Sequence, residues 1–370
     1  MFINSKYILS VGFLFVLSCN VKDHSNKGDQ VISPVDSLVF KLDSLTLSYS
    51  NAFQVVMSDS LQHLTMLNDM TNTIYFYDLK AQGAPVKLLH FEEGGEGLQN
   101  GLMSYRFHNN DSIFLMTKGL YTYLSNIDGE LIDRYSTIDL NIRQSIYSTT
   151  VSPMIFRKGE LYYNSVFFGY YKDDYKPLMK YNVSNKKVTT YGFLPEEYLN
   201  GEWGSFPYDY IYQVYDEVED RIIFSFPASN ELFEFDFLND LKIINSSSYG
   251  DNISAPFDSK KYDTHSSDWN RGVNLQPIFL ELFFDIESGN IIRVKKQKAI
   301  FDRLEDTDPK RKIELIKFSE RLSPLSFSVL DDKYKYLTNQ GFIYDGKLFF
   351  RIDIDDEDIM KFIGFDLDEI

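Results

Sequence analysis

Short apolar and aromatic segments, separated by turn sequences, recur along the chain in groups of four. The first group comprises Phe53–Met57, Leu64–Leu67, Thr73–Asp78 and Val86–Phe91, divided by the sequences SDS, NDMTN and KAQGAP. Short runs rich in β-branched and aromatic residues, bounded by Gly, Asn, Asp and Ser, are typical of β-strands. The group therefore predicts a four-stranded antiparallel meander.

Three further groups repeat this pattern. The second is Leu102–Phe107, Ser112–Met116, Leu120–Ser125 and Leu131–Tyr135; the third runs MIF, LYYNSVFF, LMKYNV and KVTTYGF; the fourth runs IYQVY, RIIFSF, ELFEFDF and LKIIN. Their third strands carry an aromatic residue at 77, 123, 181 and 235, at intervals close to the repeat length of β-propeller blades. An isolated meander cannot bury both of its faces, so the units are expected to pack radially on one another.

The last two units are less regular. The fifth runs PIFLELFF and NIIRV, then a charged stretch from Lys298 to Arg321, then SFSVL and KYKYL; the sixth offers only GFIYD, KLFFRIDI and IMKFIGFDL. A strand within Leu38–Leu47 is left over and would complete the sixth unit, which removes an exposed sheet edge. We predict an all-β fold, a β-propeller of six four-stranded blades closed by this N-terminal strand. Seven blades is the alternative if residues 246–320 contain another blade.

The composition agrees with a packed β-rich chain and limits its partners. Aromatic residues make up 16% of the 370 residues, whereas there are only 20 Gly and 11 Pro, which disfavours disorder and low complexity. The formal net charge is −17. Because such a charge repels phosphate backbones, nucleic acid is not an expected partner.

The N-terminus has the pattern of an export signal. Lys6 precedes an apolar run from Tyr7 to Leu17, which is too short to span a bilayer of about 30 Å as a helix. The sequence VLSC ends at Cys19 and resembles the lipobox of bacterial lipoproteins, where this thiol is diacylglycerated; a buried structural thiol is the alternative. We therefore predict a signal peptide over 1–18, a lipidated Cys19 with a flexible polar tether over 19–35, and a propeller domain over 36–370.

Four sequence stretches carry a resemblance to a known family. After the lipobox and tether come LNDMTNTIYFYDL, the acidic glycine stretch FEEGGEGLQNG, DSIFL and LSNIDGELIDRY. Together they resemble the family of domain of unknown function 4221, whose members are propeller-like bacterial lipoproteins. The resemblance extends from about Leu38 to the end of the chain. It implies a fold and a location without an activity.

The long connections are expected on one face of the propeller. In this fold the links between blades and the loops between second and third strands share a face, which here receives Glu92–Gly101, Glu196–Tyr208 and Tyr249–Gln276 together with the loops 169–176 and 298–321. Long loops on a rigid scaffold are a common place for binding sites. Their residues Trp203, Tyr208, Trp269, Arg271 and His265 are candidates for ligand binding, because aromatic rings stack on sugars and anchor protein partners. The alternative is that they pack the loops onto the blades.

No motif for catalysis stands out. The chain lacks G-x-S-x-G, H-E-x-x-H and the P-loop pattern, its five His residues have no metal-ligand spacing, and no cofactor or catalytic residue is predicted. The acidic cluster between Asp353 and Asp358 is interpreted as a solvated turn, with a calcium site as the alternative.

Two functions are therefore carried forward. The first is a lipoprotein of the bacterial cell envelope, held at the outer membrane, whose loop-rich face binds a glycan or an envelope protein. The second is a calcium-dependent hydrolase or lyase, similar to lactonases, acting at the propeller axis. Fold alone decides neither function.

Overall fold

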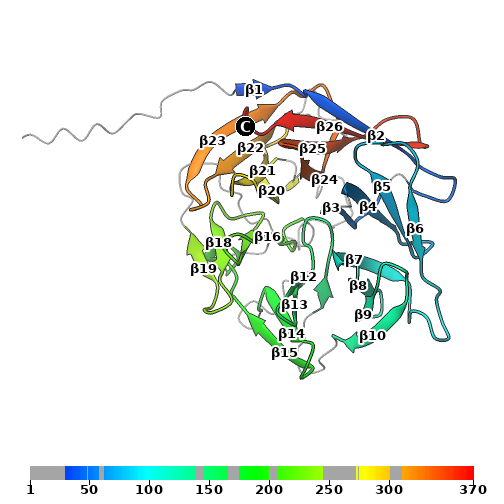
Figure 1. The fold of residues 1–370 in the computed structure, drawn as a ribbon. Coiled ribbons are helices and arrows are strands. Elements are labelled where there is room, and N and C mark those ends of the chain that lie inside the picture. The colour runs from blue at the N-terminus through cyan, green and yellow to red at the C-terminus, as the bar shows by residue number, and fades with distance from the viewer. Residues whose placement is uncertain are drawn as a thin grey trace, which may run out of the picture.

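The computed structural model describes the following parts of the chain: residues 30–47, 49–57, 62–137, 145–165, 175–199, 203, 207–244, 272–273, 275–300 and 311–370. Their strands form six sheets arranged in a ring, which Figure 1 shows end-on. The prediction of a six-bladed β-propeller is confirmed, and the described strands leave no seventh sheet. Within these residues no helix is long and apolar enough to cross a bilayer.

The blades follow one another along the chain. Blade one is β3 (Phe53–Met57), β4 (Gln62–Asn68), β5 (Thr73–Asp78) and β6 (Lys87–His90), and blade two is β7 (Leu102–Asn109), β8 (Ser112–Thr117), β9 (Tyr121–Ser125) and β10 (Leu131–Ser136). Blade three is β11 (Ile146–Tyr147), β12 (Ile155–Arg157), β13 (Glu160–Ser165), β14 (Leu178–Asn182) and β15 (Lys187–Tyr191), and blade four is β16 (Tyr212–Asp216), β17 (Arg221–Ser225), β18 (Leu232–Phe235) and β19 (Lys242–Ile244). Blade five is β20 (Ile278–Phe284), β21 (Ile291–Lys296), β22 (Ile313–Phe318), β23 (Pro324–Leu330) and β1 (Gln30–Ile32), and blade six is β24 (Tyr336–Tyr344), β25 (Lys347–Ile352), β26 (Ile359–Asp366) and β2 (Asp36–Lys41).

Burial falls from the middle of each blade to its rim. The third strand of blade one, β5, is buried on both faces except at Asp78, whereas the outer strand β10 of blade two is largely exposed. This happens because neighbouring blades cover both faces of a middle strand. Buried and exposed residues therefore do not alternate along that strand. The core accordingly consists of apolar clusters between adjacent blades, such as the one that joins blades one and two.

The ring is closed as the sequence predicts. Strand β2 pairs antiparallel with β26 along its whole length, from Asp36 opposite Gly364 to Lys41 opposite Ile359. The side chain of Phe40 is fully buried between blades six and one, with its ring 5.4 Å from that of Tyr77. Pairing and packing thus both hold the N-terminal strand in the last blade.

The predicted tether is too long. Its last part, residues 30–32, forms β1, which pairs in parallel with Ser328–Leu330 of β23 at the rim of blade five (Figure 1). Ile32 is buried in the core, and the alternation of Val31 and Ile32 is too short to be recognised in a polar stretch. The folded part therefore includes Gln30–Ile32, which precede the predicted start at Asp36.

The assignment of blade five is also corrected. The stretch Lys298–Arg321 was predicted as a charged loop, but it contains the third strand β22, and KYKYL contributes to β24 of blade six. The charged residues Glu314 and Lys317 interrupt the apolar sequence of β22, so the strand is not recognised from the sequence. Both have partners in the fold, since Glu314 lies opposite Lys295 on β21 with 3.7 Å between charged atoms, and Lys317 Nζ donates to the Leu367 carbonyl.

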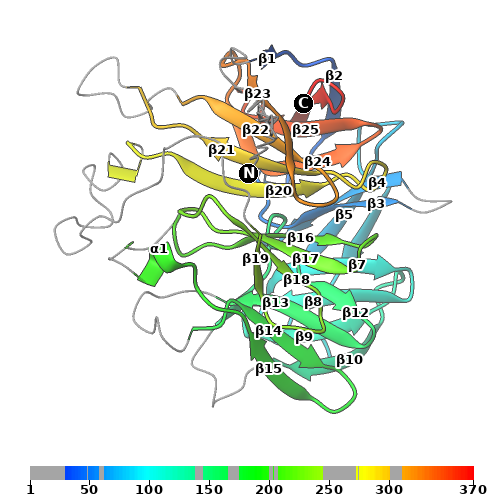
Figure 2. The same ribbon diagram turned by 90° about the vertical axis from the view of Figure 1, so that its left-hand side faces the viewer.

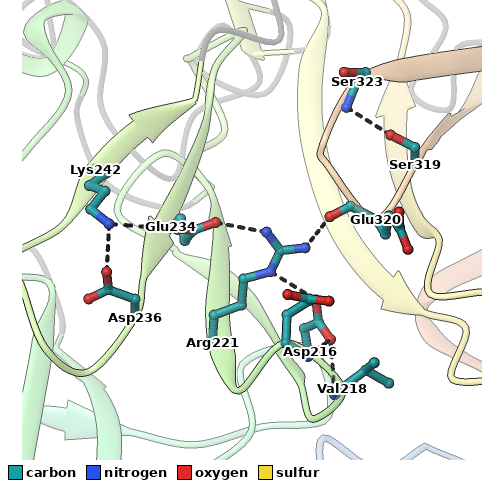
Figure 3. A network of polar contacts seen from close by, with 10 residues as sticks. Asp216, Val218, Arg221, Glu234, Asp236, Lys242, Ser319, Glu320 and Ser323 are labelled. Carbon is teal, nitrogen blue, oxygen red and sulfur yellow. Dashed lines mark hydrogen bonds and ion pairs between the residues drawn. The ribbon is translucent and has the colours of Figure 1, made fainter.

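A polar network joins blades four and five on the face opposite the long loops. Arg221 donates to the carboxylates of Asp216 and Glu234, at 2.8 Å each, and to the carbonyl oxygen of Glu320 in the β22–β23 turn (Figure 3). The Asp216 side chain is almost fully buried, and the guanidinium of Arg221 is its ion-pair partner there. The network therefore links the two blades at this end of the ring.

Candidate functional site

A cavity of about 440 Å³ lies where the inner strands of the blades converge at the axis. Its wall includes Tyr49, Tyr210, Glu281, Lys296, Arg311 and Thr338. Lys296 ends β21 and Arg311 precedes β22, so the cavity opens at the level of the loop between second and third strands. It therefore belongs to the face that carries the long connections, where α1 (Glu196–Leu199) also lies, on the left of Figure 2.

Glu281 is a buried carboxylate in this wall. It lies in the middle of β20 with 2% of its surface exposed, and its Oε2 atom has no hydrogen-bond partner among the described residues. Burial raises the pKa of the Glu281 carboxyl, an effect that Lys296 and a hydrogen bond with Thr338 oppose. A buried acceptor without a donor costs about 1 to 3 kcal/mol, so a ligand that donates a hydrogen bond here is favoured.

Two cations line the same cavity wall as this carboxylate. Burial lowers the pKa of Lys296, while the attraction of Glu281 raises it and the repulsion of Arg311 lowers it further. Arg311 is held in place because its Nε donates to the carbonyl of Gln297 at 2.8 Å and its Nη2 to the carbonyl of Gln276 at 2.7 Å. Burial lowers the pKa of Arg311 to about 10, so the guanidinium stays charged at neutral pH.

A segment of blade three closes the axis beneath the cavity. The inner strand of this blade is interrupted between β11 and β12, and residues 148–154 extend across the axis instead. The backbone N–H of Thr150 donates to the carbonyl oxygen of Asn51, next to blade one, at 2.9 Å. The backbone N–H of Gln213 on blade four donates to the carbonyl oxygen of Val151 at 3.1 Å. Thr150 also lines a smaller cavity of about 210 Å³ that includes Arg106. This axial segment, defined as residues 148–154, therefore separates two cavities and forms the floor of the larger one.

A third cavity, of about 470 Å³, adjoins the first on the loop-rich face. The two share Tyr49 and Tyr210 in their walls. Tyr210 is positioned by a 2.7 Å hydrogen bond between its hydroxyl and that of Thr149 in the axial segment. Asp209 also lines this third cavity, and burial raises the pKa of its carboxyl to about 6.

Two of the five predicted ligand residues lie in the described part of the chain, and both are buried. Trp203 is 3% exposed and Tyr208 is 1% exposed, with their rings 5.2 Å apart. Trp203 Nε1 donates to the carbonyl of Glu197 in α1 at 2.9 Å, and its ring also packs on Tyr198. In this arrangement neither side chain presents a face to a ligand, and their packing of the loop onto blade four matches the alternative interpretation. Tyr208 contributes indirectly, since it lies close enough to Arg311 to raise the pKa of that residue.

The other predicted residues lie outside the described parts of the chain. These are Trp269, Arg271 and His265 of the loop-rich face and Cys19 of the lipobox. Their roles stay predictions. The acidic cluster Asp353–Asp358 is described and forms an exposed turn between β25 and β26, as the sequence predicts. Among the described residues no three His, Cys, Asp or Glu side chains are grouped so that they could hold a metal ion.

The residues that do line the axial cavity were not selected from the sequence. Glu281 had a recognisable signal, because it is a single carboxylate within the apolar run PIFLELFF. Buried carboxylates are rare unless they are paired or functional. Tyr49, Tyr210 and Lys296 carry no such signal, since their contribution depends on which strand ends meet at the axis.

Comparisons with known proteins extend this description. The family model described as Domain of unknown function (DUF4221) matches residues 30–338. A DUF4221 family member from Bacteroides vulgatus has a similar structure, with a TM-score of 0.74 and 14% sequence identity, covering 92% of this chain and 99% of the other. A protein from Bacteroides fragilis named as a candidate exported protein gives a TM-score of 0.53 at 12% identity, covering 91% of this chain and 99% of the other.

No curated protein is significantly similar to the chain. The family match covers most of the sequence, from β1 into β24, and the similar structures share the ring of blades. The family resemblance carried by the four stretches, and the propeller fold that it implies, are thereby confirmed. The protein belongs to the family Domain of unknown function (DUF4221).

Proposed function

We propose that this protein is a lipid-anchored protein of the bacterial envelope that binds a glycan in the axial cavity of its loop-rich face. The observation that carries the proposal is the unpartnered Oε2 of Glu281 in the wall of a cavity that also holds Lys296 and Arg311. Buried polar atoms without partners are rare in folded proteins and call for a ligand or another explanation.

The shape and lining of the cavity support a sugar ligand. Its volume of about 440 Å³ falls within the range of about 300 to 1,000 Å³ that small-molecule sites occupy. Tyr49 is 46% exposed and lines both the cavity of about 440 Å³ and that of about 470 Å³, and its hydroxyl is oriented by a 2.8 Å hydrogen bond from Asn339 Nδ2. An exposed ring beside convergent polar groups can stack on a sugar while hydrogen bonds select its hydroxyls.

The lipid anchor is part of the same proposal. It is supported by the apolar run before Cys19, by the VLSC sequence, and by similarity in fold to a protein named as a candidate exported protein. Ten residues lie between Cys19 and Gln30, where β1 begins, and the stretch from Cys19 to Gln30 reaches at most about 40 Å when extended. The rim of blade five would then stay close to the membrane. Replacing Cys19 with Ser should release the protein from the membrane fraction and abolish labelling by palmitate.

Binding is tested by thermal unfolding of the full-length protein with a panel of saccharides. A ligand at a hundred times its dissociation constant stabilises the folded state by about 2.7 kcal/mol, which raises the midpoint measurably. The variant Asn339→Trp places a large ring at the cavity wall and should abolish the shift. Ile132→Trp adds the same ring to the exposed side of β10 and should leave it unchanged.

Two results would contradict this site. An unchanged shift in Asn339→Trp would place the ligand elsewhere on the protein. If no saccharide raises the unfolding midpoint, the glycan proposal is overturned. An envelope protein is then favoured as the partner, to be sought by cross-linking in the native membrane. The variant Trp203→Ala is not a suitable test, because removal of a buried ring creates a void in the core.

A further inference from the structure

We infer that the third cavity is a subsite for an ammonium group, so that the protein selects a saccharide bearing a free amine and holds that amine at Asp209. The inference rests on the function proposed above and specifies its ligand. It follows from a partly buried carboxylate, from the aromatic rings that line the same cavity, and from the continuity of this cavity with the axial one.

Asp209 brings a carboxylate into the wall of the third cavity. Burial raises the pKa of this carboxyl to about 6, and a hydrogen bond from its own backbone N–H opposes the effect, so it is ionised at pH 7. Among the residues that the structure describes, no Lys, Arg or His side chain forms an ion pair with it. A carboxylate withdrawn from water is stabilised by a nearby cation, and a ligand ammonium supplies one.

The titratable groups around Asp209 are neutral near pH 7. Burial, with the charge of Asp209 as a smaller contribution, raises the pKa of four tyrosines: Tyr147, Tyr175, Tyr198 and Tyr210. These hydroxyls therefore stay protonated and bring no charge of their own. A cationic ligand meets the carboxylate without competition from them.

A second carboxylate in the described wall is already paired. Asp69 lies 3.2 Å from Lys118 Nζ, and both side chains are about half exposed. An exposed ion pair of this kind is screened by water and salt, so it contributes little to the selection of a ligand. Asp209 is therefore the carboxylate at which a ligand amine gains most.

Aromatic rings complete a site for an organic cation. Tyr49, Tyr147 and Tyr210 line the third cavity, and the rings of Tyr147 and Tyr210 lie 4.9 Å apart. The hydroxyl of Tyr147 is held by the backbone N–H and carbonyl of Ile211, and that of Tyr210 by Thr149 Oγ1. These hydrogen bonds fix the two rings before a ligand binds. Ammonium groups are attracted to aromatic faces, most strongly where water is excluded.

The third cavity continues the axial cavity. Tyr49, Asn51, Thr149 and Tyr210 line both, and the volumes are about 470 and about 440 Å³. A saccharide of two or three rings can thus occupy both cavities, with an amine on one ring at Asp209. The net charge of −17 adds a general attraction for a positively charged ligand.

The experiment compares three β-1,4-linked trisaccharides that differ only at carbon 2 of each ring: the glucosamine trimer, its fully N-acetylated form, and cellotriose. Their affinities for the full-length protein are measured by titration calorimetry at pH 7. Because every ring carries the substituent, the result does not depend on which ring reaches Asp209. We expect the glucosamine trimer to bind about tenfold or more tightly than the other two, since hydrogen bonds to charged groups are the stronger ones. The preference should shrink at high salt, because it is electrostatic.

Variants assign the preference to the third cavity. Asp209→Asn keeps the shape of the side chain and should reduce the preference for the glucosamine trimer over cellotriose to near unity. Asp128→Asn removes the same charge from the exposed β9–β10 turn, so it is the matched control and should keep the preference. Circular dichroism verifies that both variants fold, and the comparison of the three ligands on the wild-type protein depends on neither variant.

The outcomes separate the two proposals. Equal affinities for the glucosamine trimer and cellotriose, or equally tight binding of the N-acetylated trimer, would overturn the selection of an ammonium group and leave glycan binding standing. A preference that survives in Asp209→Asn would overturn the placement of the amine at this residue. Absence of binding by all three ligands and by the wider saccharide panel would overturn the proposed function itself.

Discussion

The guanidinium carbon of Arg293 lies 3.7 Å from the centroid of the Phe279 ring, deep between blades four and five. Arg293 is fully buried, and its nitrogens donate to Ser225 Oγ and to the carbonyls of three residues in the β17–β18 connection, Phe226, Ser229 and Asn230. Burial lowers the pKa of Arg293 to about 9. One cation thus organises a loop on the face that carries the axial cavity.

Replacing Arg293 with Met should destabilise the fold. The change removes the cost of burying a charge, but it leaves several buried acceptors without donors at about 1 to 3 kcal/mol each. We expect the loss of donors to outweigh the removed cost of burying a charge. The free energy of unfolding should then fall by about 2 to 4 kcal/mol. Urea denaturation measures the change, with Arg321→Met at an exposed position as the control. A loss equal to that of the control would show that Arg293 is dispensable.

Closure of the ring gives a second prediction. Phe40→Ala removes a fully buried ring that packs between Tyr77 and Phe362, so it should cost about 3 to 5 kcal/mol in the free energy of unfolding. Val39→Ala on the same strand changes a half-buried side chain and should cost much less. Chemical denaturation of both variants tests the difference. Equal, small losses would mean that β2 adds little to closure.

Asp209 predicts a dependence of stability on pH. Its pKa in the folded protein is about 6, above its ordinary value of 3.8, so the folded state holds the proton more tightly. This contribution to stability is fully present below pH 3.8, the ordinary pKa, and is lost as the pH rises through about 6.

Asp209→Asn removes this titration. Between about pH 4 and pH 7 the stability of the variant relative to the wild type should therefore rise by about 1 to 3 kcal/mol. Urea denaturation across this pH range measures the difference, and Asp332→Asn on the surface controls for the loss of one charge. A difference between variant and wild type that stays constant with pH would contradict the raised pKa.

Most of the blade pattern could be predicted because strands are local. Phe53–Met57 and Thr73–Asp78 are found with the predicted bounds, since their apolar runs end at turn residues. The strands that were missed are those whose formation depends on pairing with segments far away in the sequence. Strand β22 carries charges whose partners lie on β21 and near the C-terminus, and β1 is a strand only because β23 offers an edge.

The candidate site was less accessible to prediction. The axial cavity opens on the face where the sequence predicts the long connections, but the predicted ligand residues Trp203 and Tyr208 are buried. An aromatic residue in a loop can either face solvent or pack under the loop, and composition does not distinguish the two. The direction in which the loop folds, here set by α1 on blade four, decides between them.

The sequence by itself determined the repeat of short strands and the N-terminal strand that completes the last blade, because both follow from local periodicity and from the need to cover sheet faces and edges. Only the tertiary structure decided the cavity. Tyr49, Tyr210, Glu281 and Lys296 come from strands and connections far apart in the chain. They meet because closure of the ring brings the inner ends of the blades to one axis, and there burial isolates charges that would be solvated in the separate strands.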